Sequence, residues 1–385
     1  PEGVFNERAI RFRREVGVPT LVAGRNVEPA MAEEALAGGV DLVAMTRALI
    51  ADPDLALKAA SGARHRPCIG LNDGCIGRLY TGKPMYCSVN PAVRDPSLGT
   101  HERVDSPARV VVAGGGPAGL EAARAAAQRG HHVVLFERRD VLGGRARLAG
   151  MRSGRERWLQ YIDWLREEVE SAGAEIRVGV EAAVSSVLGE APDAVIVATG
   201  SVLRPEARIP GEVAIMDVDD LLDAAALPDP ADGTALILDD DGHQLAPSAA
   251  EKLVAAGFDV EIATTHPAVG DLIDDTQLPF VLQKLARDGV RMTPNVDGLS
   301  SSNGVVTLRH LYSEEDEQRD GVALIVIAGR RRGLSTLRDE LAAAAPELPV
   351  TVVGDALSPR MLLDATAEGA RAGATVHPRA LSTVR

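Results

Sequence analysis

The sequence has almost no cysteine. Three cysteines occur in 385 residues, and all lie in one 20-residue window as Cys68-x6-Cys75-x11-Cys87. A disulfide-stabilised secreted scaffold carries an even number of scattered cysteines, so this pattern argues against that class. Clustered thiolates are more often metal ligands, and the alternative is three buried thiols that pack as small apolar side chains.

Positive charge is also in short supply. Lys and Arg number 41 against 55 Asp and Glu, which gives a net charge of −14, and no basic stripe is present. Nucleic acid is therefore not an expected partner. Apolar runs such as Ala194–Ala198 are only strand-sized, whereas a bilayer span needs roughly 20 residues, so we expect a soluble protein and no membrane partner. The lack of a leader at Pro1 and the metal-type cysteines favour a cytoplasmic location.

The first 63 residues have the pattern of a helix followed by one βαβ unit. The expected elements are a helix over Asn6–Val16, a strand over Val18–Ala23, a helix over Pro29–Ala37 and a strand over Leu42–Met45. A parallel sheet needs helices on both faces, and this segment has too few helices to cover both faces of its two strands. We therefore expect this segment to complete a barrel whose remainder belongs to a longer polypeptide or to a partner subunit. Residues 64–106, rich in Gly, Pro and Cys, predict a metal-organised connector.

A complete dinucleotide-binding fingerprint follows the connector. Gly114-x-Gly116-x-x-Gly119 lies between a strand and a helix, and Glu137 ends the next strand 18 residues after the last glycine. In this motif Gly114 permits the tight turn, Gly116 lets the backbone approach a pyrophosphate, and Gly119 lets the helix pack on the strand. Glu137 is expected to accept hydrogen bonds from the adenosine ribose.

Two later strands end in turns of the same kind. The strand Ala194–Ala198 is followed by Thr199-Gly200, and the strand Pro349–Val353 is followed by Gly354-Asp355. Such turns bring backbone close to a bound cofactor, and an acid such as Asp355 can hold a ribityl or ribose hydroxyl.

A second βαβ-like unit lies between these turns but lacks the spaced glycines. Its strand 235–238 ends in the acidic turn Asp239–Asp241, and the next strand ends in Thr264-Thr265 with no acid for a ribose. Three carboxylates at a strand end repel a pyrophosphate, so a nicotinamide site is disfavoured here. We expect the aspartates to form a solvated turn rather than a metal site.

Together these motifs resemble the multidomain flavoenzymes related to old yellow enzyme, the family of 2,4-dienoyl-CoA reductase and trimethylamine dehydrogenase, over essentially the whole chain. The resemblance implies an α/β fold. It assigns residues 1–63 to the last βα units of a TIM-type FMN barrel, 64–106 to an iron-sulfur-type connector, 107–215 and 335–385 to an FAD- or ADP-binding Rossmann-like domain, and 216–334 to a second, interleaved nucleotide-binding-like domain.

The resemblance also implies cofactor contacts. Val22–Arg25 and Met45–Pro53 look like the ends of barrel strands seven and eight, where barrel phosphate sites form. Arg25 and Arg47 would bind the FMN phosphate, with Gly24 and Thr46 as further donors. Gly143-Gly144-Arg145, Thr199-Gly200 and Gly354-Asp355 are similar to the family's adenine-dinucleotide motifs, which hold FAD in some members and ADP in others.

The chain departs from the family at the cysteine cluster. Leu71 stands where the family has its second cysteine, so a 4Fe-4S cluster held by four thiolates cannot form. Cys68, Cys75 and Cys87 are left to hold an iron-sulfur cluster of altered ligation. Either the three thiolates hold it alone, or Asp73 or another oxygen donor fills the gap. Zinc held by the three thiolates and His65 is a further alternative, and so is the absence of any metal.

The implied activity is hydride exchange between a small organic substrate and FMN, followed by electron transfer through the connector to FAD or to an electron-transfer flavoprotein. The family's substrate-activating residues lie on earlier barrel strands, so no catalytic residue is assigned here. The acidic turn favours the amine dehydrogenase and N-demethylase group, while an NAD(P)H-dependent enoate or dienoyl-CoA reductase is an alternative. Two further alternatives are an accessory electron-transfer subunit and a non-catalytic nucleotide-binding remnant. We also expect the protein to form an oligomer.

Overall fold

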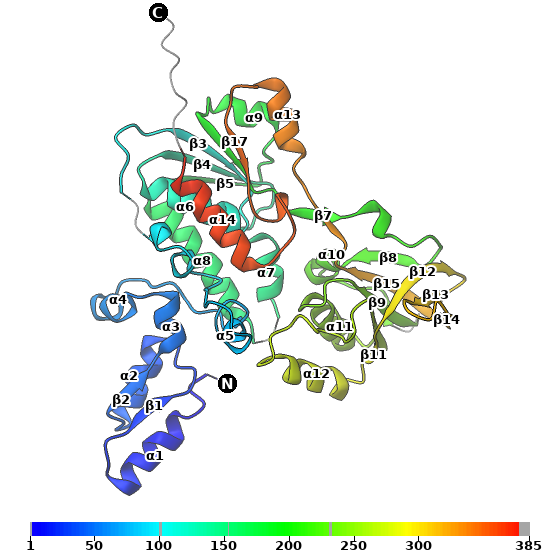
Figure 1. Ribbon diagram of the computed structural model, residues 1–385, viewed down its shortest axis with the longest axis horizontal. Helices are drawn as coiled ribbons and strands as arrows, with labels where there is room; N and C mark the ends of the chain where they lie inside the picture. Colours follow the sequence, from blue (N-terminus) through cyan, green and yellow to red (C-terminus); the bar gives the residue numbers. More distant parts are fainter. Residues whose placement is uncertain (1, 100–101, 153, 231–232, 377–385) are drawn as a thin grey trace, which may run out of the picture. The chain divides into compact units, whose positions relative to one another are not determined.

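The runs of Val, Ile and Ala form two separate parallel sheets in the computed structural model of the protein, which describes residues 2–99, 102–152, 154–230 and 233–376 (Figure 1). One unit contains the chain up to Gly200 and again from Ser335, and the other contains Ser201–Leu334. The second unit is therefore inserted in the sequence of the first. The predicted α/β class with interleaved Rossmann-like sheets is confirmed.

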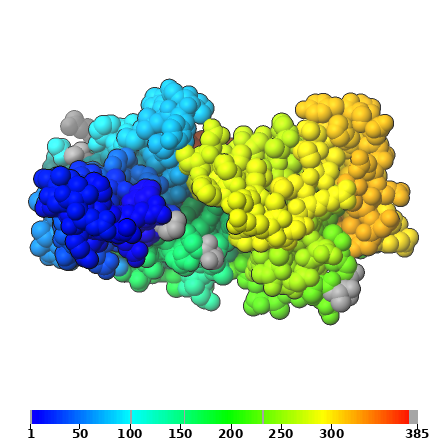
Figure 2. All heavy atoms as spheres, turned by 90° about the horizontal axis from the view of Figure 1, so that it is seen from below, coloured from blue at the N-terminus to red at the C-terminus, as the bar shows by residue number. Residues whose placement is uncertain are grey.

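The N-terminal segment of unit 1 has the predicted order of elements. Its elements are α1 (Asn6–Val16), β1 (Leu21–Ala23), α2 (Pro29–Ala37), β2 (Leu42–Ala44), α3 (Thr46–Ala51) and α4 (Leu55–Ser61). β1 and β2 pair in parallel, with Leu21 opposite Leu42. Val22 is buried with Ala35 and Val40, whereas Leu21 and Leu42 are 59% and 60% exposed. Helix α1 has no buried residue, and Figure 2 shows it in dark blue on the surface.

The described residues of the connector form three short helices, α5 (Ile76–Tyr80), η1 (Pro91–Val93) and η2 (Pro96–Gly99). Few of its residues are apolar, yet Ile69 and Val89 are buried in the main core of unit 1 together with Ala51 of α3. The connector is thus packed into the unit that contains the glycine fingerprint.

The large sheet of unit 1 is parallel throughout, in the order β17-β6-β3-β4-β5. Its strands are β3 (Arg109–Ala113), β4 (His132–Glu137), β5 (Glu175–Val178), β6 (Ala194–Val197) and β17 (Val350–Val352). Side chains alternate between its two faces, as the pleat of a strand requires. Val110 and Val112 enter the core with helices α6 (Pro117–Gln128) and α8 (Glu156–Ser171), whereas Val111 and Ala113 enter the core with α9 (Val184–Gly189) and α13 (Thr336–Ala344).

The remaining elements of unit 1 complete the carboxyl edge and one face of this sheet. They are α7 (Gly144–Gly150), η5 (Gly354–Ala356) and α14 (Leu362–Ala374). Figure 1 shows α14 beside α6. A Cβ at Gly369 of α14 would lie 2.1 Å from the Ala118 carbonyl oxygen, and one at Gly373 would lie 2.2 Å from that of Ala122. Glycine at these positions allows the two helices to approach closely.

Unit 2 has its own parallel sheet, in the order β11-β10-β9-β15-β8. The strands are β8 (Ala214–Asp217), β9 (Thr234–Asp239), β10 (Val260–Thr264), β11 (Arg291–Thr293) and β15 (Val322–Ala328), and the helices are α10 (Val218–Asp223), α11 (Leu245–Ala255) and α12 (Leu278–Arg287). The predicted βαβ-like unit corresponds to β9, α11 and β10.

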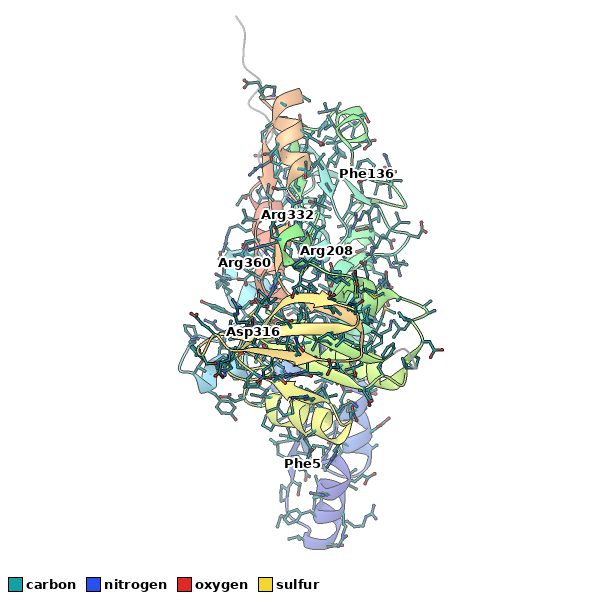
Figure 3. The ribbon with its side chains drawn as sticks, turned by 90° about the vertical axis from the view of Figure 1, so that its right-hand side faces the viewer. Phe5, Phe136, Arg208, Asp316, Arg332 and Arg360 are labelled. Carbon is teal, nitrogen blue, oxygen red and sulfur yellow. The ribbon has the colours of Figure 1, made fainter. Side chains whose placement is uncertain are left out.

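Two smaller antiparallel sheets complete unit 2. One contains β12 (Val296–Ser302), β13 (Val305–His310) and β14 (Asp316–Arg319), and the other pairs β7 (Ser201–Leu203), which precedes the short helix η3 (Pro205–Ala207), with β16 (Arg331–Gly333). Figure 3 labels Asp316 on the first sheet, where it accepts a hydrogen bond from Arg309 of the neighbouring strand at 2.8 Å. Among the described helices of both units, none has the length and apolar character to cross a membrane.

Candidate functional site

The glycine fingerprint forms the turn between β3 and α6, as predicted. Gly114 has a φ of +112°, which a residue with a side chain rarely adopts. A Cβ at Gly119 would lie 1.9 Å from the Gly114 carbonyl oxygen, so the helix can pack on the turn only with glycine there. A Cβ at Gly116, in contrast, would meet no atom within 4 Å. The backbone at Gly116 therefore borders open space at the amino end of α6, where the helix dipole favours an anion.

The carboxylate of Glu137 lies beside this turn. One of its oxygens accepts the Gly115 N–H at 2.7 Å and the other accepts the Arg139 N–H at 2.9 Å. Both bonds fix the position of a side chain that is otherwise buried. Each carboxylate oxygen has a second lone pair, so the fixed group retains capacity to accept from a ribose hydroxyl.

The other predicted turns of unit 1 meet the same edge of the sheet. The Gly143 N–H donates to the Gly115 carbonyl at 2.8 Å, and a Cβ at Gly144 would lie 3.4 Å from the Gly116 Cα. Gly354 packs against Ala118 at the start of α6.

Two further sets of predicted residues complete this edge. Thr199-Gly200 directly follow Ala198, whose carbonyl oxygen would lie 2.3 Å from a Cβ at Gly114. Arg145 forms an ion pair with Asp355 at 3.2 Å. All ten predicted adenine-dinucleotide residues thus lie around one edge of the sheet; they are Gly114, Gly116, Gly119, Glu137, Gly144, Arg145, Thr199, Gly200, Gly354 and Asp355.

The predicted FMN phosphate residues follow the two strands of the N-terminal segment. Gly24 and Arg25 come after β1, and Thr46 and Arg47 begin α3 after β2, so both pairs lie at the carboxyl ends of parallel strands. Both arginine side chains reach the connector. Arg47 donates to Asn72 Oδ1 at 2.8 Å, and the Arg25 guanidinium lies near the backbone of Gly70 and 3.6 Å from Glu2.

The three cysteines lie in the same part of unit 1, and all are free thiols. Cys68 and Cys87 pack against the apolar core, together with Leu71. Burial is the main cause that raises the pKa of the Cys87 thiol to about 11, and it also raises the pKa of Cys75.

The donor set does not fit a metal centre. Within the described ranges, no group of three or more His, Cys, Asp or Glu side chains is arranged to hold a metal ion. The Cys3His alternative also loses its histidine, because His65 Nε2 lies 3.1 Å from Glu28 in an ion-pair geometry.

The acidic turn of unit 2 is not solvated throughout, so that prediction was wrong for Asp239. This side chain is only 2% exposed. One of its oxygens accepts the N–H groups of Asp241 and Gly242 at 3.1 and 3.2 Å, and the other accepts the Thr264 hydroxyl at 2.9 Å. Burial raises the pKa of Asp239 to about 6. The carboxylate therefore accepts the hydrogen bonds of the backbone N–H groups that, in a dinucleotide-binding turn, would donate to a phosphate.

These features agree with the similarity of the chain to known proteins. Residues 109–182 match the family described as FAD dependent oxidoreductase. The chain is 34% identical over 312 residues to an N,N-dimethylglycine/sarcosine dehydrogenase of Chromohalobacter salexigens, a match that covers 77% of this chain and 44% of that protein. It is 32% identical over 360 residues to a multifunctional alkene reductase/demethylase of Caballeronia cordobensis, covering 89% of this chain and 51% of that protein.

A solved structure, the histamine dehydrogenase from Rhizobium sp. 4-9, superposes with a TM-score of 0.86 at 25% identity, over 97% of this chain and 60% of that chain. The chain is a homologue of these flavin-dependent oxidoreductases. The predicted resemblance to the old yellow enzyme-related family is confirmed, as is the expectation of flavoprotein oxidoreductase homology. The chain spans only about half the length of these curated flavoenzyme relatives.

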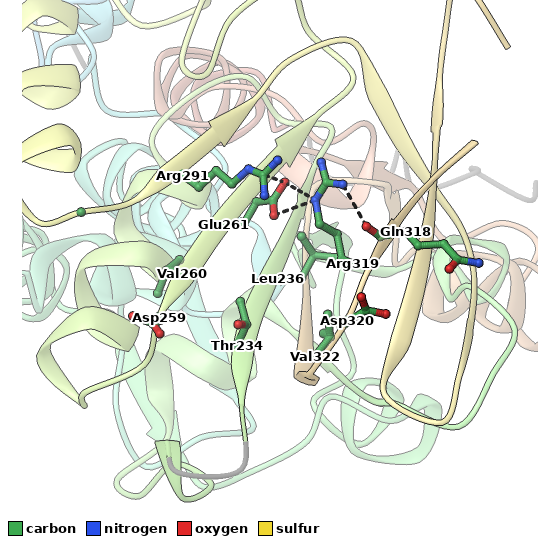
Figure 4. A pocket seen from close by; sticks show the side chains of 11 residues that line it. Thr234, Leu236, Asp259, Val260, Glu261, Arg291, Gln318, Arg319, Asp320 and Val322 are labelled. Carbon is green, nitrogen blue, oxygen red and sulfur yellow. Dashed lines mark hydrogen bonds and ion pairs between the residues drawn. The ribbon is translucent and has the colours of Figure 1, made fainter. Parts of the chain in front are cut away.

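Unit 2 of this flavoenzyme homologue also has a cavity of about 440 Å³ at the amino ends of β9, β10 and β15 (Figure 4). The cavity is at the opposite edge of the sheet from the Asp239 turn. Its buried carboxylate, Glu261, accepts from Arg319 at 2.9 Å and from Thr293 at 2.6 Å, and Arg291 lies 3.7 Å away. Glu261 and its two arginines thus form an ion-pair network in the wall of this cavity.

Sequence reasoning missed two acids of unit 1, of which Glu368 is partly buried and Glu121 is fully buried. Glu368 of α14 accepts the Gly354 N–H at 2.9 Å and pairs with Arg360, which Figure 3 labels. Glu121 of α6 is fully buried and accepts from Arg124 at 2.8 Å and from the Tyr161 hydroxyl at 3.1 Å. No motif marks Glu368, whereas Glu121 could have been noticed as an acid on the apolar face of a predicted helix.

Proposed function

We propose that this chain is the nucleotide-binding part of a flavin-dependent oxidoreductase and holds FAD, or ADP alone, at the carboxyl edge of the unit 1 sheet. The observation that carries the proposal is the open backbone at Gly116 beside the fixed carboxylate of Glu137. Backbone N–H groups at the start of α6 would bind the pyrophosphate, and Glu137 would bind the adenosine ribose. The turns at Gly144-Arg145, Thr199-Gly200 and Gly354-Asp355 would border the rest of the cofactor.

We also propose that residues 1–63 contribute to an FMN phosphate site. Arg25 and Arg47 would bind the phosphate, with Gly24 and Thr46 as further donors. The hydrogen bond from Arg47 to Asn72 supports this proposal because it fixes the direction of a cationic side chain at a strand end. The remainder of the barrel would belong to a longer polypeptide or to a partner subunit.

The proposed reaction is oxidation of a small organic substrate, with an N-methyl or other amine carbon as hydride donor. A bound flavin accepts hydride, and the protein supplies binding, orientation and electrostatics. The names of the dehydrogenase and demethylase relatives support this substrate class. Electrons would pass to FAD or to an electron-transfer flavoprotein, and the three free thiols support a reducing, cytoplasmic setting. No side chain of this chain is proposed as a catalytic acid or base.

An NAD(P)H-dependent reductase is the competing function. The buried Asp239 carboxylate opposes it, since that carboxylate already accepts the N–H groups that a nicotinamide dinucleotide would require. Once the remainder of the barrel is supplied, anaerobic addition of NADH or NADPH to the flavin-loaded protein is therefore expected to leave the flavin oxidised, while a secondary or tertiary methylamine reduces it. Rapid bleaching by either nicotinamide would reverse the proposed direction of electron flow.

Gly116→Ala tests the nucleotide site directly. The new methyl group has space in the protein but would occupy the position of the pyrophosphate, so we expect the Kd for ADP and FAD to rise at least about tenfold, equivalent to about 1.4 kcal/mol. Isothermal titration calorimetry measures this change. Gly189→Ala is the matched control, because a Cβ there also meets no atom within 4 Å. Equal affinities of wild type and Gly116→Ala would contradict the proposal.

A further inference from the structure

We propose that the connector of this chain, residues 64–99, is a metal-free strut. In this connector, Leu71 supplies apolar packing at the position of a metal ligand. Hydrogen bonds to both flanking segments hold the connector in place, as a metal cluster would. This inference does not rest on the proposed function, because it concerns only how the connector is held.

The first observation is the environment of Leu71. Its side chain is partly buried against the main core of unit 1, as are those of Cys68 and Cys87. Ile69 and Val89 are buried members of the same core. An apolar side chain in this position gains free energy from burial and supplies no lone pair to a metal. The position of Leu71 thus contributes apolar packing and no metal ligand.

The second observation is the arrangement of the possible donors. Cys75 lies at the start of α5, and Cys68 and Cys87 pack against the apolar core. Cys68 is close enough to interact electrostatically with both of the other thiols. In the part of the chain that the structure describes, these thiols form no three-donor group with one another or with any His, Asp or Glu. His65 is instead paired with Glu28.

The third observation is that protein contacts anchor the connector on both sides. Toward the N-terminal segment, the Arg66 N–H donates to Asp52 at 2.7 Å, Asn90 donates to the Ile50 carbonyl at 3.0 Å, and Arg47 donates to Asn72 at 2.8 Å. Toward the nucleotide-binding part, the Thr366 hydroxyl donates to the Ser88 carbonyl at 3.0 Å, and the Arg66 guanidinium stacks 4.5 Å from the Trp164 ring centroid. Several of these groups are buried, where each bond is costly to break.

The strut therefore has a positioning role in place of an electron-relay role. Asn72 directly follows Leu71 and accepts the hydrogen bond of Arg47. Packing of Leu71 consequently fixes the backbone that directs an arginine at the end of β2. Structural zinc and iron-sulfur centres contribute folding free energy when they are present, so their absence must be balanced by contacts of this kind.

Metal analysis tests the proposal. The full chain is produced in cells supplied with iron and sulfide, purified without oxygen, and assayed for iron, acid-labile sulfide and zinc per chain. A Cys68→Ser/Cys75→Ser double variant sets the background. We expect the wild type and the double variant to have the same background level of each. Stoichiometric iron and sulfide, or zinc, in the wild type and not in the double variant would overturn the proposal.

Thermal unfolding supplies a second readout. We expect Leu71→Ala to lower the unfolding midpoint by a few degrees, because it removes partly buried methyl groups from the core. Leu57→Ala is the matched control, since that side chain is 72% exposed on α4. Adding a strong chelator should leave the wild-type midpoint unchanged. A chelator-dependent drop, or a Leu71→Ala midpoint equal to that of the wild type, would count against the strut.

Discussion

At the scale of single residues, the buried carboxylate of Asp239 makes stability depend on pH. Its pKa is raised to about 6 by burial. The Asp239 carboxyl therefore binds a proton more tightly in the folded chain than in the unfolded chain. Proton binding at Asp239 adds to the free energy of unfolding at pH values below the ordinary pKa of Asp, and this contribution is lost as the pH rises through about 6.

We expect Asp239→Asn to abolish this loss. The free energy of unfolding of Asp239→Asn relative to wild type should rise by up to about 3 kcal/mol between about pH 4 and pH 7, because one pKa unit corresponds to about 1.4 kcal/mol. Urea unfolding at several pH values measures the difference. Asp240→Asn removes a charge from the same turn and serves as the control. Parallel pH curves for Asp239→Asn and wild type would contradict the expectation.

The buried pair of Glu121 and Arg124 leads to a second prediction at this scale. Glu121→Gln removes the counter-charge of a guanidinium that is itself buried, so we expect a loss of about 3–5 kcal/mol in the free energy of unfolding. Glu15→Gln breaks the exposed pair with Arg11 and should change stability little. Chemical denaturation compares the two variants, and a loss no larger than that of Glu15→Gln would show that the buried charges are not coupled.

At the scale of elements, the β3–α6 turn separates two roles of glycine. Gly119→Ala places a methyl group on the Gly114 carbonyl oxygen and should destabilise the folded state by about 1–3 kcal/mol or more. Gly116→Ala should leave the unfolding midpoint unchanged while it weakens ADP binding. Circular dichroism melts in the absence of nucleotide measure the first effect. Equal melts of the two variants would show that helix α6 can shift away from the turn.

The sequence predicted the elements around this turn well, since a glycine fingerprint, an apolar strand and a helical pattern all favour the same structure. The burial of Asp239 could not be predicted, because its partners are backbone N–H groups and a hydroxyl on the following strand. The same applies to Glu368, which lies 14 residues from the Gly354 N–H that it accepts. Such contacts depend on the three-dimensional path of the chain.

At the scale of the whole molecule, the division into two units predicts a selective response to nucleotide. ADP at about 100 times its Kd should add about 2.7 kcal/mol to the stability of the unit that binds it. We expect hydrogen exchange to slow in residues 2–200 and 335–376, and to change little in 201–334. Gly116→Ala is the control, because ADP should not slow hydrogen exchange in a variant that binds it weakly. Protection concentrated in 201–334 would assign the nucleotide to the other unit.

The interleaving of the two units was predictable from the order of their strand-end turns. The core residues of the connector were harder to predict from the sequence, because Ile69 and Val89 are isolated apolar residues in a segment rich in Gly and Pro. Residue patterns identify runs that form sheets and helices, whereas single buried residues are determined by the surfaces that surround them.

The glycine contacts between α14 and α6 bear on the order in which the protein assembles during synthesis. Helix α6 emerges from the ribosome early, but α14 and strand β17 follow only after all of 201–334 has been made. Unit 2 is continuous in sequence and can fold as soon as it emerges. The nucleotide-binding edge, which needs Gly354 and Asp355, is completed last. A nascent chain of which only the residues up to about 334 have left the ribosome would therefore hold a finished unit 2 within the sequence of an unfinished unit 1, with one face of α6 still uncovered.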